Sequence, residues 1–184
     1  MALLVLGLVL LIGAHLVPAN RRLRAGLAAK LGENGYKGAF SLISLAGLVL
    51  IVIGYGQAPR DQIFQASETA RLFLPVGMAI AFILMATAYV PGRLRRLLKH
   101  PMLAGVLIWS VLHLLANGDL ASNVLFGSFA VWSVFAIISA ARRGQRIGSA
   151  RESAMADLGG VAAGLIVFAV VLYLHPFLFG VSPL

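Results

Sequence analysis

Long runs of mostly apolar residues recur six times along this chain of 184 residues. They cover residues 2–18, 39–56, 72–91, 101–117, 121–140 and 158–179. A membrane-spanning helix needs about 20 such residues, with about 17 as the lower limit, so all six runs qualify. Segments such as SLISLAGLVLIVIGYG are apolar on every face, whereas the strands of a membrane barrel alternate in polarity. The sequence therefore predicts an all-α integral membrane bundle of about six transmembrane helices, forming one domain over residues 1–184.

The composition excludes a water-soluble globule. Hydrophobic residues make up 60% of the chain, charged residues 11%, and the mean hydropathy is +0.95. The first run has no basic segment before it and no convincing cleavage site, which favours a retained helix over a signal peptide. The segment QAPRDQIFQASETARLF, from Gln57 to Phe73, is predicted to form a short amphipathic helix at the membrane interface. It either connects two spans or covers an outward-facing site.

The basic residues indicate an orientation in the membrane. The net charge is +9, and thirteen of the fifteen Lys and Arg lie in three alternate connections: five in 21–37, four in 93–99 and four in 142–151. Basic loops stay in the cytoplasm, so both termini of this multi-pass protein are expected outside. Because the charge follows topology, nucleic acid is not an expected partner, whereas membrane lipids with anionic headgroups are.

Few side chains in the apolar runs can support chemistry. The chain has no cysteine, which excludes disulfides and thiolate metal sites. No acidic residue lies in the middle of a run, so the carboxylate that a Ser-His-Asp triad or a proton relay requires is missing there. Polar residues inside a membrane are expensive and are therefore functional candidates. Those that remain are His15, His100, His113 and His175.

His113 stands out because it lies inside an apolar run, with Trp109 one helical turn before it and Asn117 one turn after it. A hydrogen bond from Asn117 is expected to orient an imidazole that binds a metal. The same pair also suits a polar contact between helices.

Depth restricts how the histidines can pair. At 1.5 Å per residue, His100 and His113 are about 20 Å apart along one helix and cannot bind the same iron. The expected orientation places His113 and His175 towards the outer face, and His15 and His100 towards the cytoplasm. Two histidines from different helices can hold haem in a bundle. Their expected depths in the membrane therefore favour a pair of His113 with His175, or of His15 with His100. Alternatively, His15, His100 and His175 simply reach water or headgroups.

The chain also resembles a known family. The run RRLLKHPMLAGVLIWSVLHLLANGDLASNVLFGSFAVWS, from Arg95 to Ser133, closely resembles NnrU membrane proteins, and the flanking GAHLVPANRRLR and LHPFLFGVSP fit as well. NnrU proteins are bacterial and are associated with denitrification and nitric-oxide metabolism. The resemblance therefore implies a multi-pass protein of the bacterial inner membrane, with both termini in the periplasm. The family is similar to the plant 15-cis-zeta-carotene isomerase, an integral membrane b-haem enzyme.

This resemblance implies haem b, with His113 and His15 as axial ligands. The plant enzyme is described as having an alternative cysteine ligand three residues before its fourth-helix histidine, where this chain has Ser110, so exchange between thiolate and imidazole is not available. Because His15 is expected at the inner face, His175 remains a second candidate partner for His113. Arg93, Arg95 and Arg96 are candidates to pair with haem propionates if haem lies towards the cytoplasm.

Two classes of function follow from these observations. The first is a b-haem protein with redox or isomerase-like chemistry on a hydrophobic or small gaseous substrate. The second is a non-enzymatic subunit or assembly factor that packs against respiratory or denitrification membrane proteins. A small transporter is disfavoured, because internal repeats and intramembrane carboxylates are missing from the sequence.

Overall fold

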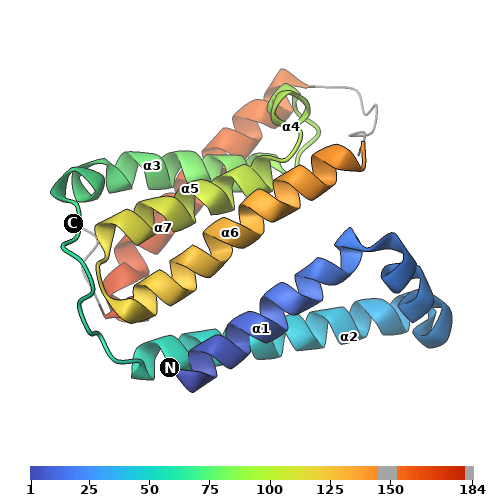
Figure 1. The fold of residues 1–184 in the computed structure, drawn as a ribbon. Coiled ribbons are helices and arrows are strands. Elements are labelled where there is room, and N and C mark those ends of the chain that lie inside the picture. Colours follow the sequence, from blue (N-terminus) through green and yellow to red (C-terminus); the bar gives the residue numbers. More distant parts are fainter. Residues whose placement is uncertain (145–152, 181–184) are drawn as a thin grey trace. The chain divides into compact units, whose positions relative to one another are not determined.

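A computed structural model describes residues 1–144 and 153–180. Most of the described residues are helical, with no strand among them, which confirms the all-α class (Figure 1). Five helical segments are long and apolar enough to cross a membrane: α1 (Ala2–Leu16) together with the 3-10 helix η1 (Val17–Ala19), α2 (Arg21–Gln57), α3 (Glu68–Thr87), α6 (Leu120–Arg142) and α7 (Ala154–Phe179). The sixth expected span is the shorter apolar helix α5 (Pro101–Ala116). Which side of the membrane the termini occupy stays a prediction.

The chain forms two compact units. The first contains residues 1–63 and 119–128, and the second contains residues 64–118 and the chain from Phe129 onwards. Helix α6 therefore begins in the first unit and ends in the second. The expectation of one domain over residues 1–184 stays a prediction.

In the first unit, α1 and α2 form a helical hairpin (Figure 1). They are joined by the short 3-10 helix η1 (Val17–Ala19), and the side chain of Asn20 caps α2 by accepting a hydrogen bond from the Leu23 amide at 3.1 Å. The basic segment after the first span is thus helical from Arg21 onwards. The helix is kinked at Gly32, whose φ of 71° is a conformation that glycine adopts easily.

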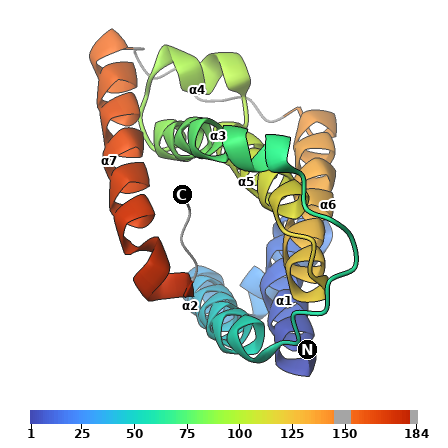
Figure 2. The ribbon, with the colours of Figure 1, turned by 90° about the vertical axis from the view of Figure 1, so that its left-hand side faces the viewer.

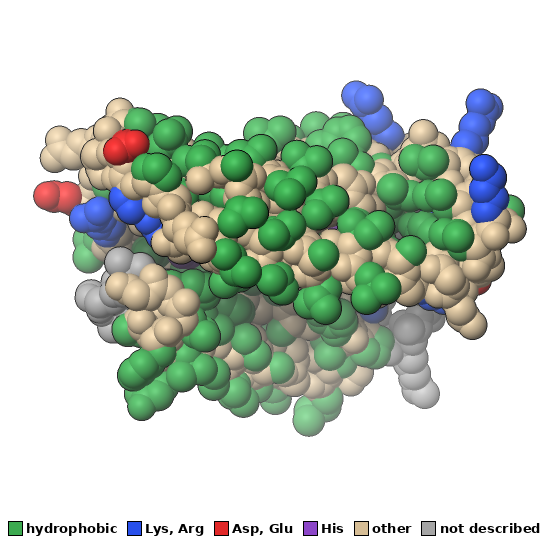
Figure 3. Space-filling model, turned by 90° about the horizontal axis from the view of Figure 1, so that it is seen from below, with side chains coloured by type: hydrophobic (Ala, Val, Ile, Leu, Met, Phe, Trp, Pro, Cys, Tyr) green, Lys and Arg blue, Asp and Glu red, His purple; other side chains and the backbone are tan. Residues whose placement is uncertain are grey.

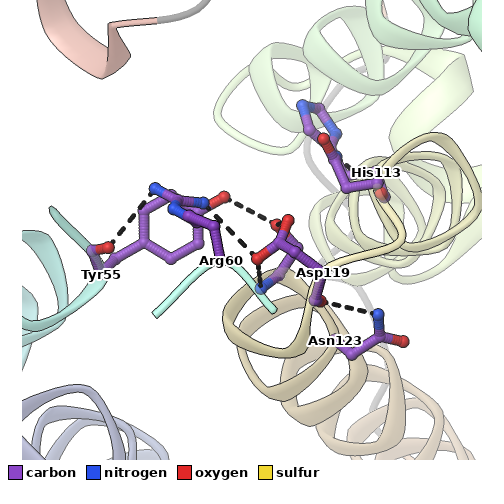
Figure 4. Close-up of polar contacts among 7 residues, drawn as sticks. Tyr55, Arg60, His113, Asp119 and Asn123 are labelled. Atoms are coloured by element: carbon purple, nitrogen blue, oxygen red, sulfur yellow. Dashed lines mark hydrogen bonds and ion pairs between the residues drawn. The ribbon is translucent and has the colours of Figure 1, made fainter. Parts of the chain in front are cut away.

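A polar cluster joins the end of α2 to the start of α6 within this unit (Figure 4). The Asp119 carboxylate accepts hydrogen bonds from the Ser122 amide at 3.0 Å and from the Ser122 hydroxyl at 2.6 Å. Arg60 lies 3.6 Å from this carboxylate, and its guanidinium stacks over the Tyr55 ring at 4.0 Å. The Asp119 carboxylate thus satisfies the Ser122 amide, which is one of the first-turn amides of α6 that helix geometry leaves unpaired.

The connection between α2 and α3 differs from the sequence expectation. The prediction of an amphipathic helix over Gln57–Phe73 is wrong, because residues 58–67 contain no helix. Pro59 has no amide proton to continue α2, and backbone groups further along bond to another segment instead. The Phe64 amide donates to Gly118 at 3.3 Å, and the Ser67 amide donates to Leu115 at 3.0 Å.

In the second unit, α3 packs against both α5 and α7 (Figure 2). Glycines permit this close approach: a Cβ atom on Gly105 would meet the Ala81 carbonyl oxygen at 2.7 Å, and one on Gly164 would meet the Ile83 Cα at 2.5 Å. The short helix α4 (Arg93–Leu98) contacts α5 and α7. Asp157 of α7 accepts hydrogen bonds from the first amides of α4.

The surfaces of the helices suit a lipid environment. Large hydrophobic side chains are exposed along α2, including Leu42, Leu45 and Val52. Figure 3 likewise shows hydrophobic side chains over much of the face that it draws. Such exposed apolar side chains match helices that face acyl chains. Arg146 and Arg151, which belong to the third basic connection, lie outside the described residues.

Candidate functional site

The second unit contains a pocket of about 710 Å³ between α3, α5 and α7. This volume lies within the range of about 300–1,000 Å³ that is usual for small-molecule sites. The lining residues are Arg71, Leu72, Leu74, Pro75, Met78 and Phe82 of α3, His113 and Ala116 of α5 with the adjoining Asn117, and Phe168, Val171, Leu172 and His175 of α7.

The pocket is polar at one end and apolar further in. Helix α7 runs antiparallel to α3, since Gly160 lies against Thr87 and Gly164 lies against Ile83. His175, eleven residues beyond Gly164, is therefore at the same end of the unit as the start of α3 and Arg71. The last turn of α5, with His113, reaches this end too. Towards the middle of the unit, the Phe82 and Phe168 rings lie 6.2 Å apart.

The His113 imidazole is oriented by its own helix. Its Nδ1 atom lies 2.9 Å from the carbonyl oxygen of Trp109, one turn earlier. A carbonyl oxygen only accepts, so Nδ1 carries the proton and the neutral ring has its lone pair on Nε2. The Trp109 ring also contacts the imidazole, with centroids 5.7 Å apart, and packs edge-on against Phe129. A hydrogen bond of this kind is what fixes the tautomer and direction of metal-binding histidines.

Asn117 has a different role from the expected one. It ends α5, and both its main-chain amide and its side-chain amide donate to the carbonyl oxygen of His113, at 3.0 and 2.8 Å. The contact is therefore with the His113 backbone, whereas the sequence led us to expect one with the imidazole. Asn117 terminates the helix directly beyond His113 and lines the same pocket.

His175 is the second histidine of the pocket. It lies in the last part of α7, immediately before Pro176, and its ring contacts Phe179 at a centroid distance of 4.8 Å. The structure thus brings His113 and His175 to one pocket from two different helices.

The other two histidines lie elsewhere in the chain. His15 belongs to the first unit, where its Nδ1 atom donates to the Leu11 carbonyl at 2.8 Å and its ring packs against Phe40. This arrangement repeats that of His113. His100 directly precedes α5, at the opposite end of this helix from His113.

Sequence reasoning missed Arg71 as a site residue. Arg71 lies in the first turn of α3, and its Nε atom donates to the Ala116 carbonyl at 3.1 Å. By contrast, Arg93, Arg95 and Arg96 are on α4, which follows the far end of α3. The signal available in the sequence was topological: Arg71 begins a span at the same expected membrane face as His113 and His175.

The side chains of the pocket that could bind a metal limit the kind of group that it suits. Among residues 1–144 and 153–180, no group of three or more His, Asp or Glu side chains is placed to bind a metal ion. Two imidazoles beside a large apolar lining instead fit a group that brings most of its own ligands, as a porphyrin does.

Comparison with known proteins identifies one family. The model of the family described as NnrU protein matches residues 3–183, nearly the whole chain. No curated protein and no solved structure matches the chain.

Proposed function

The chain belongs to the NnrU family, and we propose that it is a membrane protein that binds haem b between His113 and His175. The observation that carries this proposal is the shared pocket: two imidazoles, from α5 and α7, line one apolar space of about 710 Å³. Imidazole is a common axial ligand of haem iron, and apolar side chains suit a porphyrin ring.

The residues of the pocket have distinct roles in this proposal. The Trp109 carbonyl holds the His113 ring by Nδ1, so that Nε2 would be the atom that binds the iron. Side chains such as Met78, Phe82 and Phe168 would shield the bound group from water. Haem bound there would supply an iron centre able to exchange one electron and to coordinate a small ligand. We expect redox or isomerase-like chemistry on a hydrophobic or small substrate, in the context of denitrification or nitric-oxide metabolism.

His15 is the alternative partner of His113. The resemblance to the plant isomerase implies this histidine, and its Nδ1 atom donates to a main-chain carbonyl in the same way as that of His113. We favour His175, because it lines the pocket of His113 within one compact unit.

Absorption spectroscopy of single variants tests the assignment. The full chain, expressed with added haem and purified in mild detergent, is expected to show a Soret band. His113→Ala and His175→Ala should lose or shift this band, whereas His15→Ala and the control His100→Ala should keep it.

Three other results would contradict the haem proposal or its choice of ligands. A colourless protein contradicts the haem proposal and favours the non-enzymatic subunit of a respiratory or denitrification complex. Loss of the band in His15→Ala, with retention in His175→Ala, moves the second ligand to His15. An unchanged spectrum in His113→Ala refutes the central assignment.

A further inference from the structure

We infer that Arg71 is the anion-binding residue of the pocket, and that the natural ligand carries a carboxylate on a large apolar body. The inference rests on the proposed function for the location of the site, since haem b with its propionates is one such ligand. It does not require iron, because a long-chain fatty acid has the same combination of groups.

Arg71 is held in place from two sides. Its own helix begins at Ser67, whose hydroxyl accepts from the Ala70 amide and whose carbonyl accepts from the Arg71 amide at 3.1 Å. The Ser67 amide in turn donates to Leu115 of α5. Together with the bond from Arg71 Nε to Ala116, these contacts tie the start of α3 to the end of α5. The guanidinium is therefore positioned before any ligand arrives.

The orientation of the guanidinium suits a carboxylate. Nε is engaged by the Ala116 carbonyl, and the two terminal nitrogens form the fork that pairs with both oxygens of a carboxylate. Ion pairs such as those of Arg24 and Arg60 occur within the described ranges 1–144 and 153–180, but Arg71 is in none of them. Arg71 is exposed and lines the pocket, so a ligand can reach its guanidinium.

The rest of the lining specifies the body of the ligand. Nine of the thirteen lining side chains are apolar: eight lie on α3 and α7, and the ninth, Ala116, is on α5. Arg71, His113, Asn117 and His175 supply its polar groups. The ligand that matches this division has one anionic end and a large apolar remainder.

The test compares acids with their neutral esters on the full chain in mild detergent. The first pair of probes is ferric protoporphyrin IX and its dimethyl ester, and the second is a fluorescent long-chain fatty acid and its methyl ester. Wild type is expected to bind at least one acid about ten- to hundred-fold more tightly than its ester, the range expected for a hydrogen-bonded charge pair. Arg71→Gln should remove this preference and leave ester binding unchanged, and Arg71→Lys should keep part of it.

Arg60→Gln is the matched control, because Arg60 also lies beside the end of a spanning helix but belongs to the first unit. It should retain the preference for the acid. If Arg71→Gln fails to fold, as judged by circular dichroism and thermal unfolding, the inference is tested with wild type and Arg71→Lys. The quantity compared is then the ratio of their affinities for the acid and for the ester.

The outcomes separate this inference from the haem proposal. Equal binding of acid and ester by wild type for both pairs overturns the inference, as does an Arg71→Gln variant that keeps the preference. If neither porphyrin form binds, only the haem proposal is contradicted. The comparison of the fatty acid with its ester then tests the role of Arg71. Failure of all four probes to bind overturns both.

Discussion

The Nδ1 atom of His113 donates a hydrogen bond to the Trp109 carbonyl, 2.9 Å away on the same helix. His15 makes the equivalent contact with Leu11 in the first unit. In both cases the bond spans one helical turn, and it directs the Nε2 lone pair away from the helix backbone. Two of the four histidines are thus oriented locally, by the helix that carries them.

Ligation by His113 predicts chemical rescue. His113→Gly removes the imidazole but leaves space beside the Trp109 ring, so haem binding is expected to be lost and then restored by added imidazole. The measurement is the Soret band during titration with imidazole. His100→Gly, at the other end of α5, should respond to neither change. A His113→Gly variant that stays colourless at saturating imidazole, while wild type is coloured, argues that His113 acts in folding.

The contact between α1 and α2 predicts opposite effects of two alanine substitutions on the same helix. A Cβ atom on Gly54 would clash with the backbone of Leu3 and Leu4, whereas one on Gly56 would meet nothing within 4 Å. Gly54→Ala is expected to lower the free energy of unfolding by about 1–3 kcal/mol, the usual cost of overpacking. Gly56→Ala should be neutral or raise it by up to about 1 kcal/mol, through helix propensity. Denaturation in detergent measures both, and equal effects would contradict close packing at Gly54.

The Asp119 carboxylate is expected to stabilise the start of α6. Asp119→Ala removes acceptors for the Ser122 amide and hydroxyl and should cost about 1–2 kcal/mol, as loss of a helix cap does. Arg60→Gln should cost less than about 1 kcal/mol, because its side chain is 46% exposed and such ion pairs are weak. Thermal unfolding of the two variants in the same detergent compares the effects. A larger loss in Arg60→Gln would show that the ion pair, and not the cap, dominates.

Asp157 is expected to hold the first turn of α4. Its two carboxylate oxygens accept from the Arg93 amide at 2.9 Å and from the Leu94 amide at 3.0 Å. Asp157→Ala should cost about 1 kcal/mol and speed hydrogen exchange in Arg93–Leu98. Exchange in α1 serves as the internal control and should not change. Unaltered exchange in α4 would mean that contacts with α5 and α7 suffice to hold it.

Much of the fold follows from local properties of the sequence. Hydropathy and run length predict helical spans, and the structure has a helix at each of the six predicted runs. The histidine within the fourth run is visible without any structure. Membership of the NnrU family was also predicted from sequence motifs and is confirmed by the match over residues 3–183.

Other features required the tertiary structure. The backbone of residues 58–67 is predicted as helix from its amphipathic pattern, yet Phe64 and Ser67 donate to carbonyls near the end of α5 instead. Likewise, the spacing of Asn117 suggests a contact with the imidazole, but Asn117 caps the helix at the His113 carbonyl. Local pattern does not reveal which of two competing hydrogen-bond partners is used.

The sequence by itself determined that this protein is a bundle of apolar helices. It also determined that histidines are the main side chains in these helices able to support chemistry. Both follow from hydropathy and residue type, which are properties of each segment alone. Only the tertiary structure decided that Arg71, His113 and His175 line one pocket. These residues lie on three helices far apart in the chain, and the packing of α3 against α5 and α7 through small residues is what brings them together.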